Sequence, residues 1–269
     1  MIRINKNDVC VNKFPDGTLL LKEKIPGECG EKKQKAVITW LFENNEELVT
    51  LIYLAGHLRA HGITELALEM PYIPNARQDR VKTEEDVFTL KYFAQVINWL
   101  AFASVTVLDP HSSVSEALID RIRVKTPEAF VRKAIDRIGG VENLTMFYPD
   151  EGACKRYSGM FRLPYAFGIK NRDWETGDIK GLTVSGMTDC IRDRKVLIMD
   201  DISSRGGTFY FSAQKLKELG AKEIYLYISH CENTILEGEV LTSGLIKKVF
   251  TTNSIFTKKD ERIEVFDYE

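Results

Sequence analysis

Two adjacent carboxylates, Asp200 and Asp201, separate an apolar run from a glycine-containing segment in VLIMDDISSRGGTF, Val196 to Phe209. The apolar run is typical of a buried strand, and the residues after it indicate a loop that cradles phosphate. No Gly-Lys-Ser follows, so this is not a Walker loop, and the glycine spacing differs from that of dinucleotide-binding turns. Gly206 and Gly207 would let the backbone approach a phosphate closely. The pattern predicts a phosphate-binding loop beside two carboxylates.

Three more segments place charged or imidazole groups just past a strand. These are PYIPNARQDR (71–80), VLDPH (107–111) and YPDEG (148–152). In open parallel sheets, ligands bind at the carboxyl ends of the strands. Four such clusters in one chain indicate a binding edge rather than incidental turns.

The elements around these clusters alternate between strand and helix. Helical spacing of apolar residues predicts helices over 46–62, 85–103 and 209–221, the first closed by Gly62 and the last near Gly220. Apolar runs predict strands at 65–74, 104–111, 144–150, 195–201, 223–230 and 247–255. This alternation predicts an α/β fold with two similar domains, each a mainly parallel sheet flanked by helices. We expect the boundary near Gly139–Asn143, giving domains of residues 1–140 and 141–269.

Composition narrows the class of protein. The 269 residues carry a formal net charge of −2, which does not favour a nucleic-acid partner. No apolar run approaches the ~20 residues of a membrane span, and the N-terminus lacks an apolar signal core. The five cysteines are widely spaced without a CxxC pair, which indicates reduced thiols. We therefore expect a cytoplasmic protein with no membrane partner.

Nearly the whole chain resembles the ribose-phosphate pyrophosphokinases (PRPP synthetases), relatives of the type I phosphoribosyltransferases. In chain order, the similar segments are KFPDGT, PYIPNARQDR, VLDPH, YPDEGACKR, IKNRD and VLIMDDISSRGGT. The resemblance implies a type I phosphoribosyltransferase-like fold. It also implies transfer of the terminal diphosphate of Mg-ATP to the anomeric hydroxyl of ribose 5-phosphate, with release of AMP.

The resemblance assigns the opening segment to the acceptor. Asp200 and Asp201 would face the ribose 2- and 3-hydroxyls, since a carboxylate accepts hydrogen bonds from vicinal hydroxyls. The 5-phosphate would be held by the loop residues Ser204, Arg205, Gly206, Gly207 and Thr208.

Two further pairs carry the chemistry in this resemblance. Lys170 and Arg172 lie in KNRDWETGDIKG, which we interpret as a mobile loop that stabilises charge developing toward the AMP leaving group. His111 and Asp150 would contact Mg²⁺ or its waters, because Mg²⁺ takes few protein ligands beside nucleotide phosphates. A structural histidine and a turn residue are the alternatives that the sequence leaves open.

ATP contacts are expected from the two N-terminal segments. Phe14 would stack on adenine and Asp16 would accept from its amino group, while Arg77 and Gln78 would contact ATP phosphate or ribose. Asp79 would hold Arg77 in place. An ordinary Pro-Asp-Gly turn is the alternative for KFPDGT. In the family this turn reaches a neighbouring subunit, so the resemblance implies a homo-oligomer.

Three departures from the family pattern leave details open. Ser204-Arg205 replaces the usual Asp-Thr, and arginine can bind phosphate through a bidentate fork. The acceptor is therefore ribose 5-phosphate or, alternatively, ADP-ribose, as in a phage-type branch that serves NAD salvage. Thr18 stands where the family has Glu, which leaves the nucleotide preference open. The chain is also shorter than most relatives, so the family's hexamer and allosteric control are not assumed.

Other interpretations rank lower. A phosphoribosyltransferase would share the phosphate loop but consume PRPP, and a non-catalytic regulatory homologue would lose site motifs that are present here. His57 and His61 resemble half a zinc site but lack a third ligand, and Cys154 has no accompanying base.

Overall fold

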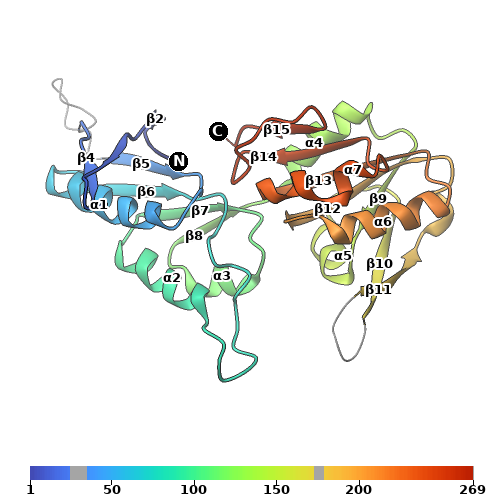
Figure 1. The fold of residues 1–269 in the computed structure, drawn as a ribbon, viewed down its shortest axis with the longest axis horizontal. Coiled ribbons are helices and arrows are strands. Elements are labelled where there is room, and N and C mark those ends of the chain that lie inside the picture. The colour runs from blue at the N-terminus through green and yellow to red at the C-terminus, as the bar shows by residue number, and fades with distance from the viewer. Residues whose placement is uncertain (25–34, 173–178, 269) are drawn as a thin grey trace. The chain divides into compact units, whose positions relative to one another are not determined.

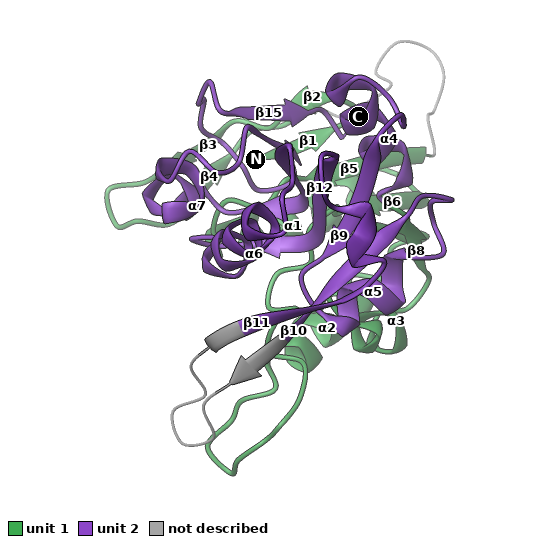
Figure 2. Ribbon diagram, turned by 90° about the vertical axis from the view of Figure 1, so that its right-hand side faces the viewer, with its two compact units in different colours: residues 1–126 green, residues 127–269 purple. Residues whose placement is uncertain are grey.

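The structure, a computed structural model, describes residues 1–24, 35–172 and 179–268, and the side chains of residues 170–181 lie outside that description (Figure 1). The chain forms two compact units, Met1–Thr126 and Pro127–Glu269, which Figure 2 colours separately. Each unit has its own mainly parallel sheet with helices, which confirms the predicted fold class.

The first unit has a six-stranded sheet in the order β2-β1-β5-β6-β7-β8. Its strands are β1 (Ile2–Ile4), β2 (Asn7–Asp8), β5 (Lys35–Trp40), β6 (Glu65–Glu69), β7 (Ser104–Leu108) and β8 (Ile122–Lys125). β5 to β8 are parallel, while β1 and β2 are antiparallel to their neighbours. The helices are α1 (Glu46–Ala60), α2 (Thr89–Trp99) and α3 (Ser113–Leu118). A separate hairpin joins β3 (Val11–Lys13) and β4 (Leu19–Leu21).

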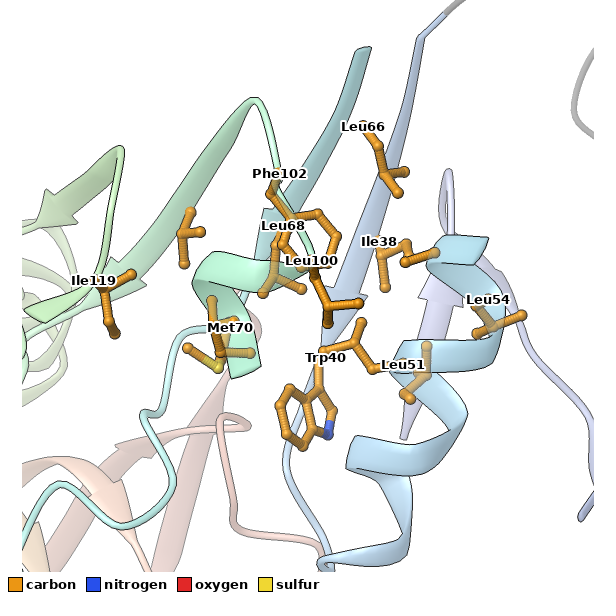
Figure 3. Close-up of a cluster of buried hydrophobic side chains, with 14 of the residues drawn as sticks. Ile38, Trp40, Leu51, Leu54, Leu66, Leu68, Met70, Leu100, Phe102 and Ile119 are labelled. Atoms are coloured by element: carbon orange, nitrogen blue, oxygen red, sulfur yellow. The ribbon is translucent and has the colours of Figure 1, made fainter. Parts of the chain in front are cut away.

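The core of the first unit forms where α1 and α2 pack on the sheet. Figure 3 shows Ile38 and Trp40 of β5 beside Leu51 and Leu54 of α1, all at most 1% exposed. The Trp40 indole Nε1 donates to Glu47 Oε2 at 2.9 Å, which satisfies the buried N–H. Every second residue at the start of β5 is buried, so this strand presents mainly one face to the core.

The second unit has a seven-stranded sheet in the order β11-β10-β9-β12-β13-β14-β15. Its strands are β9 (Leu144–Tyr148), β10 (Tyr165–Arg172), β11 (Ile179–Gly186), β12 (Lys195–Ser203), β13 (Glu223–Cys231), β14 (Lys248–Thr252) and β15 (Ile263–Phe266). All neighbours pair in parallel except β10 and β11. The helices are α4 (Glu128–Ile138), α5 (Glu151–Tyr157), α6 (Gly207–Glu218) and α7 (Glu239–Thr242), with 3-10 turns η1 (Thr188–Cys190) and η2 (Asn233–Glu237).

The central strand β12 is buried on both faces. Val196 and Ile198 belong to the core cluster that includes α6, whereas Leu197 and Met199 belong to the cluster that includes α4 and α5. A strand alternates its side chains between the two faces, so even positions of β12 point toward α6 and odd positions toward α4 and α5. The same alternation predicts on which face each of the carboxylates Asp200 and Asp201 begins at the end of the strand.

The compact units divide earlier than the domain boundary expected at residue 140. Helix α4 falls within the range expected for the first domain, residues 1–140. Its buried residues Val131, Ala134, Ile135 and Ile138 nevertheless pack in a cluster with Leu144 and Met146 of β9. The division therefore falls between Thr126 and Pro127, before α4.

Two other sequence expectations concern environment. No helix among the described residues is long and apolar enough to cross a membrane. The four cysteines in the described part of the chain, Cys10, Cys154, Cys190 and Cys231, are free thiols.

Candidate functional site

The candidate phosphate loop links β12 to α6. The strand ends at Ser203, and Gly206 precedes the helix with φ +77°, a left-handed conformation that favours glycine. A Cβ on Gly206 would lie 2.6 Å from Val240 Cγ1, while one on Gly207 would meet nothing within 4 Å. The first turn of α6 thus follows the loop directly, and its backbone N–H groups form an anion-binding end.

A second segment, formed by η2 and the start of α7, packs against this loop. A Cβ on Gly238 would lie 1.8 Å from the Arg205 carbonyl oxygen, so the two backbones are in direct contact. The Arg205 guanidinium lies 3.3 Å from a Glu237 carboxylate oxygen, and both side chains are exposed. The arginine expected to contact phosphate therefore has an acidic partner at the loop surface.

Asp200 and Asp201 have different surroundings. Asp200 accepts a hydrogen bond from the Asp201 N–H at 3.0 Å, and its even position places it on the α6 face. Asp201 lies on the α5 face, is 4% exposed, and its carboxylate is 3.3 Å from Arg156 Nη1. Burial, followed by the charge of Asp201, a side-chain hydrogen bond with Asp201 and the more distant charge of Asp150, raises the pKa of Asp200. The two carboxylates therefore have different partners: the Asp201 N–H for Asp200 and the Arg156 guanidinium for Asp201.

Asp150 begins helix α5 at the carboxyl end of β9. Its side chain accepts from the Ala153 N–H at 3.0 Å, which is an N-cap hydrogen bond. β9 pairs directly with β12, so Asp150 is close enough to influence the pKa of Asp200. The structure thus gives Asp150 a capping role, in line with the turn alternative, close to Asp200.

Lys170 and Arg172 do not lie on a loop, contrary to the sequence expectation. Both belong to β10, where Lys170 pairs with Leu182 and Arg172 with Ile179 of β11. Backbone pairing with the alternating sequence of β11 extends the strand through these polar residues. Their side chains and residues 173–178 of the predicted mobile loop lie outside the described part of the chain.

In the first unit, Asp79 joins the segments that follow β6 and β7. Its carboxylate, 7% exposed, accepts from Arg80 Nε at 2.7 Å and Nη2 at 3.1 Å. The Arg80 hydrogen bond, helped by one from Ser112 and by the His111 charge, lowers the pKa of Asp79 to about 2. Asp79 and His111 are therefore neighbours. The guanidinium that donates two hydrogen bonds to Asp79 is that of Arg80.

Arg77 and Gln78 are exposed on the same segment. The Gln78 Oε1 accepts from Thr89 Oγ1 at 2.9 Å, and the Gln78 carbonyl accepts from the Leu90 N–H at 3.3 Å. These bonds tie the segment to the start of α2 and fix where it leaves the sheet.

The KFPDGT segment forms the turn of the β3–β4 hairpin. Asp16 accepts from the Thr18 N–H at 2.9 Å and from Thr18 Oγ1 at 2.7 Å, which lowers the pKa of Asp16. Gly17 has φ +86°, as such a turn requires. Phe14 is 49% exposed, so its ring is accessible at the turn.

The structure gathers some predicted residues and separates others. Asp150, Asp200 and Asp201 meet in the second unit, His111 and Asp79 meet in the first, and Phe14 and Asp16 lie on a hairpin of their own. In the described part of the chain, no group of three or more His, Cys, Asp or Glu side chains is arranged to hold a metal. A cavity of ≈ 330 Å³ lies elsewhere, and no predicted site residue lines it; its lining includes Leu20, Tyr53 and His57.

Sequence reasoning did not assign roles to Arg80, Ser112, Arg156 or Glu237. Arg80 and Arg156 lie inside segments that had been recognised, PYIPNARQDR and YPDEGACKR, so their charge was a usable signal. Glu237 lies far along the chain from Arg205, and no local pattern connects the two.

Comparisons with known proteins point to one family. The chain is 29% identical over 98% of its length to a ribose-phosphate pyrophosphokinase from Pyrococcus abyssi, 90% of which is covered. It is 27% identical over 90% of its length to the enzyme of that name from Sulfolobus acidocaldarius, with 82% covered. No family model matches the chain.

The fold comparison agrees. The crystal structure of phosphoribosylpyrophosphate synthetase from Mycobacterium smegmatis superimposes with a TM-score of 0.75 at 17% identity, covering 97% of this chain and 86% of that one. The fold is therefore that of the PRPP synthetases. The chain is therefore similar in sequence to ribose-phosphate pyrophosphokinases over nearly its whole length and has the fold of the PRPP synthetases.

Proposed function

We propose that this protein transfers the diphosphate of Mg-ATP to the anomeric hydroxyl of ribose 5-phosphate and releases AMP. The observation that carries the proposal is the carboxyl end of β12, where Asp200 and Asp201 directly precede a loop that ends at the α6 N-terminus. Carboxylates suit the sugar hydroxyls and the helix N-terminus suits the 5-phosphate. The names of the curated relatives support the same reaction.

The remaining roles follow the sequence assignments. Arg77 and Gln78, which are exposed, contact ATP, and Phe14 offers an accessible ring for adenine. Asp79 fixes the segment that carries Arg77, with Arg80 as the partner of its carboxylate. Lys170 and Arg172 stabilise charge on the transferred group, which is how phosphoryl-type transfer is mainly catalysed.

Magnesium is the metal that we propose for this reaction. Asp150 stands beside Asp200, whose pKa is raised partly by the Asp150 charge, so a cation would relieve repulsion there. We assign contact with Mg²⁺ or its waters to Asp150 in the second unit and to His111 in the first, since Mg²⁺ keeps several waters beside nucleotide phosphates. When bound, the metal neutralises phosphate charge.

The proposal also concerns assembly and setting. The exposed Phe14 at the tip of the β3–β4 hairpin suits adenine binding in a neighbouring copy, so we propose a homo-oligomer. The free thiols of the described cysteines suit a reducing, cytoplasmic setting.

The exposed guanidinium of Arg205 favours one second candidate, in which ADP-ribose is the acceptor. Its partner Glu237 is also exposed, and such pairs contribute little, so a second acceptor phosphate would compete well for the guanidinium. Under this alternative, Arg205→Ala raises the acceptor KM at least fivefold. An unchanged KM in that variant removes the alternative.

The deciding experiment measures AMP release from Mg-ATP with ribose 5-phosphate and, separately, with ADP-ribose, at matched low concentrations. We expect ribose 5-phosphate to be preferred. Preference for ADP-ribose would replace the acceptor, and no AMP with either sugar would refute diphosphate transfer.

A further inference from the structure

Helix α5 brings a cation to the end of β12. The helix begins at its N-cap Asp150, after β9, and β9 lies beside β12 in the sheet. Arg156, in the last turn of the helix, places Nη1 3.3 Å from Asp201 Oδ2. The side chain of Asp201 is 6% exposed and that of Arg156 is 35% exposed, so the pair is only partly screened by water.

Tyr157 restrains the guanidinium of Arg156. The Arg156 Cζ lies 5.6 Å from the centre of the Tyr157 ring, and Nη1 is 3.4 Å from the Tyr157 hydroxyl. Tyr157 itself is fully buried and packs near Tyr148 of β9, with ring centres 6.3 Å apart. The guanidinium is therefore held against a buried residue of the core, although the arginine itself is partly exposed.

We propose that Arg156 is a positioning residue of the acceptor site, which holds the Asp201 carboxylate in the orientation that receives a sugar hydroxyl. The inference rests on the proposed function, and it names a residue to which neither the sequence analysis nor the proposed reaction gave a role. Its physical basis is that a buried carboxylate needs a charged partner to stay ionised and fixed.

The alternation of side chains along β12 gives the two carboxylates different neighbours. Asp200 is on the α6 face, beside the phosphate loop, and is fixed by the Asp201 N–H. Asp201 is on the opposite face, where the side chains of Leu197 and Met199 below it are apolar and fully buried. Arg156 places a cation against Asp201 on this face, with Nη1 3.3 Å from Oδ2.

The test compares Arg156→Met and Arg156→Lys with a control, Lys155→Met, which removes the neighbouring exposed cation of the same helix. For Arg156→Met, we expect the KM for ribose 5-phosphate to rise roughly 10- to 100-fold, as for loss of a hydrogen bond to a charged group. The KM for Mg-ATP should stay within about twofold, since Arg156 acts only on the acceptor carboxylate. Arg156→Lys keeps the charge without the planar fork and should restore part of the affinity.

A double-mutant cycle with Asp201→Asn provides the second measurement. If Arg156 acts through Asp201, Arg156→Met should add less than about twofold to the KM effect of Asp201→Asn. Fully additive effects, or a loss of kcat and thermal stability with an unchanged acceptor KM, would overturn the proposal. Should Arg156→Met fail to fold, the cycle is run with Arg156→Lys.

Failure of the reaction and failure of the inference are separable. Wild-type AMP release with ribose 5-phosphate tests the reaction alone. Calorimetric titration of wild type and Arg156→Met with ribose 5-phosphate tests the positioning role without turnover. Equal affinities in that titration would refute the role of Arg156 even in an active enzyme.

Discussion

The guanidinium of Arg80 donates two hydrogen bonds to the carboxylate of Asp79, the residue immediately before it in the chain. This fork links a buried acid to an exposed base at the carboxyl end of the first sheet. It leaves Asp79 strongly acidic, with a pKa of about 2. The consequence is a measurable dependence of stability on pH.

Asp79→Asn should destabilise the protein at neutral pH. The folded pKa of about 2 is below the ordinary aspartate value of 3.8, so this carboxylate stabilises the fold above pH 3.8 and loses its contribution as the pH falls through 2. We expect a loss of about 2 kcal/mol at pH 7 that shrinks below pH 3.8. Denaturant unfolding at pH 7, 5 and 3 measures it. Arg80→Met should match this loss, and a deficit independent of pH would contradict the fork.

Asp200→Asn should have the opposite effect on stability. The folded pKa of Asp200 is raised by burial and by Asp201, so ionisation of this carboxyl costs folding free energy as the pH rises above its unfolded value. The amide cannot ionise, and we expect a gain in stability at pH 8 that vanishes near pH 4. Thermal unfolding at both pH values checks it. Acceptor-dependent AMP release should fall at least tenfold, and a variant that is both active and unchanged in stability refutes this view of Asp200.

Adjacent glycines of the phosphate loop should respond differently to alanine. In Gly206→Ala, the new Cβ would contact Val240, and the backbone at this position is left-handed. We therefore expect the free energy of unfolding to fall by about 1–3 kcal/mol. Gly207→Ala has open space at the helix start and should leave stability within about 1 kcal/mol. If the α6 N-terminus binds the 5-phosphate closely, Gly207→Ala still raises the acceptor KM. Unfolding curves and steady-state kinetics on the two variants separate these effects. Equal destabilisation of the two variants would contradict the close contact between Gly206 and Val240.

Lys170→Ala and Arg172→Ala should lower the rate of transfer rather than substrate affinity. Groups that stabilise charge only in the transition state reduce kcat, typically by about 10²–10³ each. The intervening Asn171→Ala is the control on the same strand and should retain most activity. Rapid-quench measurement of AMP formation checks the chemical step. Large changes in KM for Mg-ATP with little change in kcat would instead assign both cations to ground-state binding.

Local pattern was enough to predict the elements that carry the site. The apolar runs of β9, β12 and β13 are buried strands, and the helical spacing in α1, α2 and α6 matches the structure. Once these strands are predicted to be parallel, the charged groups that follow them are expected at the carboxyl edge of a sheet. The opposite faces of Asp200 and Asp201 were also available from strand alternation, although the sequence analysis treated the pair as one unit.

Other features depend on contacts that local sequence does not encode. Lys170 and Arg172 interrupt the apolar pattern, and only pairing with β11 makes their segment a strand. Helix α4 is amphipathic, but its sequence does not say which sheet its apolar face will cover. The pairing of Arg205 with Glu237 arises because the chain returns after β13 to lie against the loop.

The segment formed by η2 and the start of α7 therefore helps to set the shape of the phosphate loop, although it is not part of that loop. The Gly238 backbone lies so close to the Arg205 carbonyl that any side chain there would push the loop outward. A library restricted to η2 and the start of α7 would therefore reshape the opening of the loop while leaving every residue of the loop itself intact. Acceptor preference in this scaffold can be sought by engineering a segment that need not touch the acceptor.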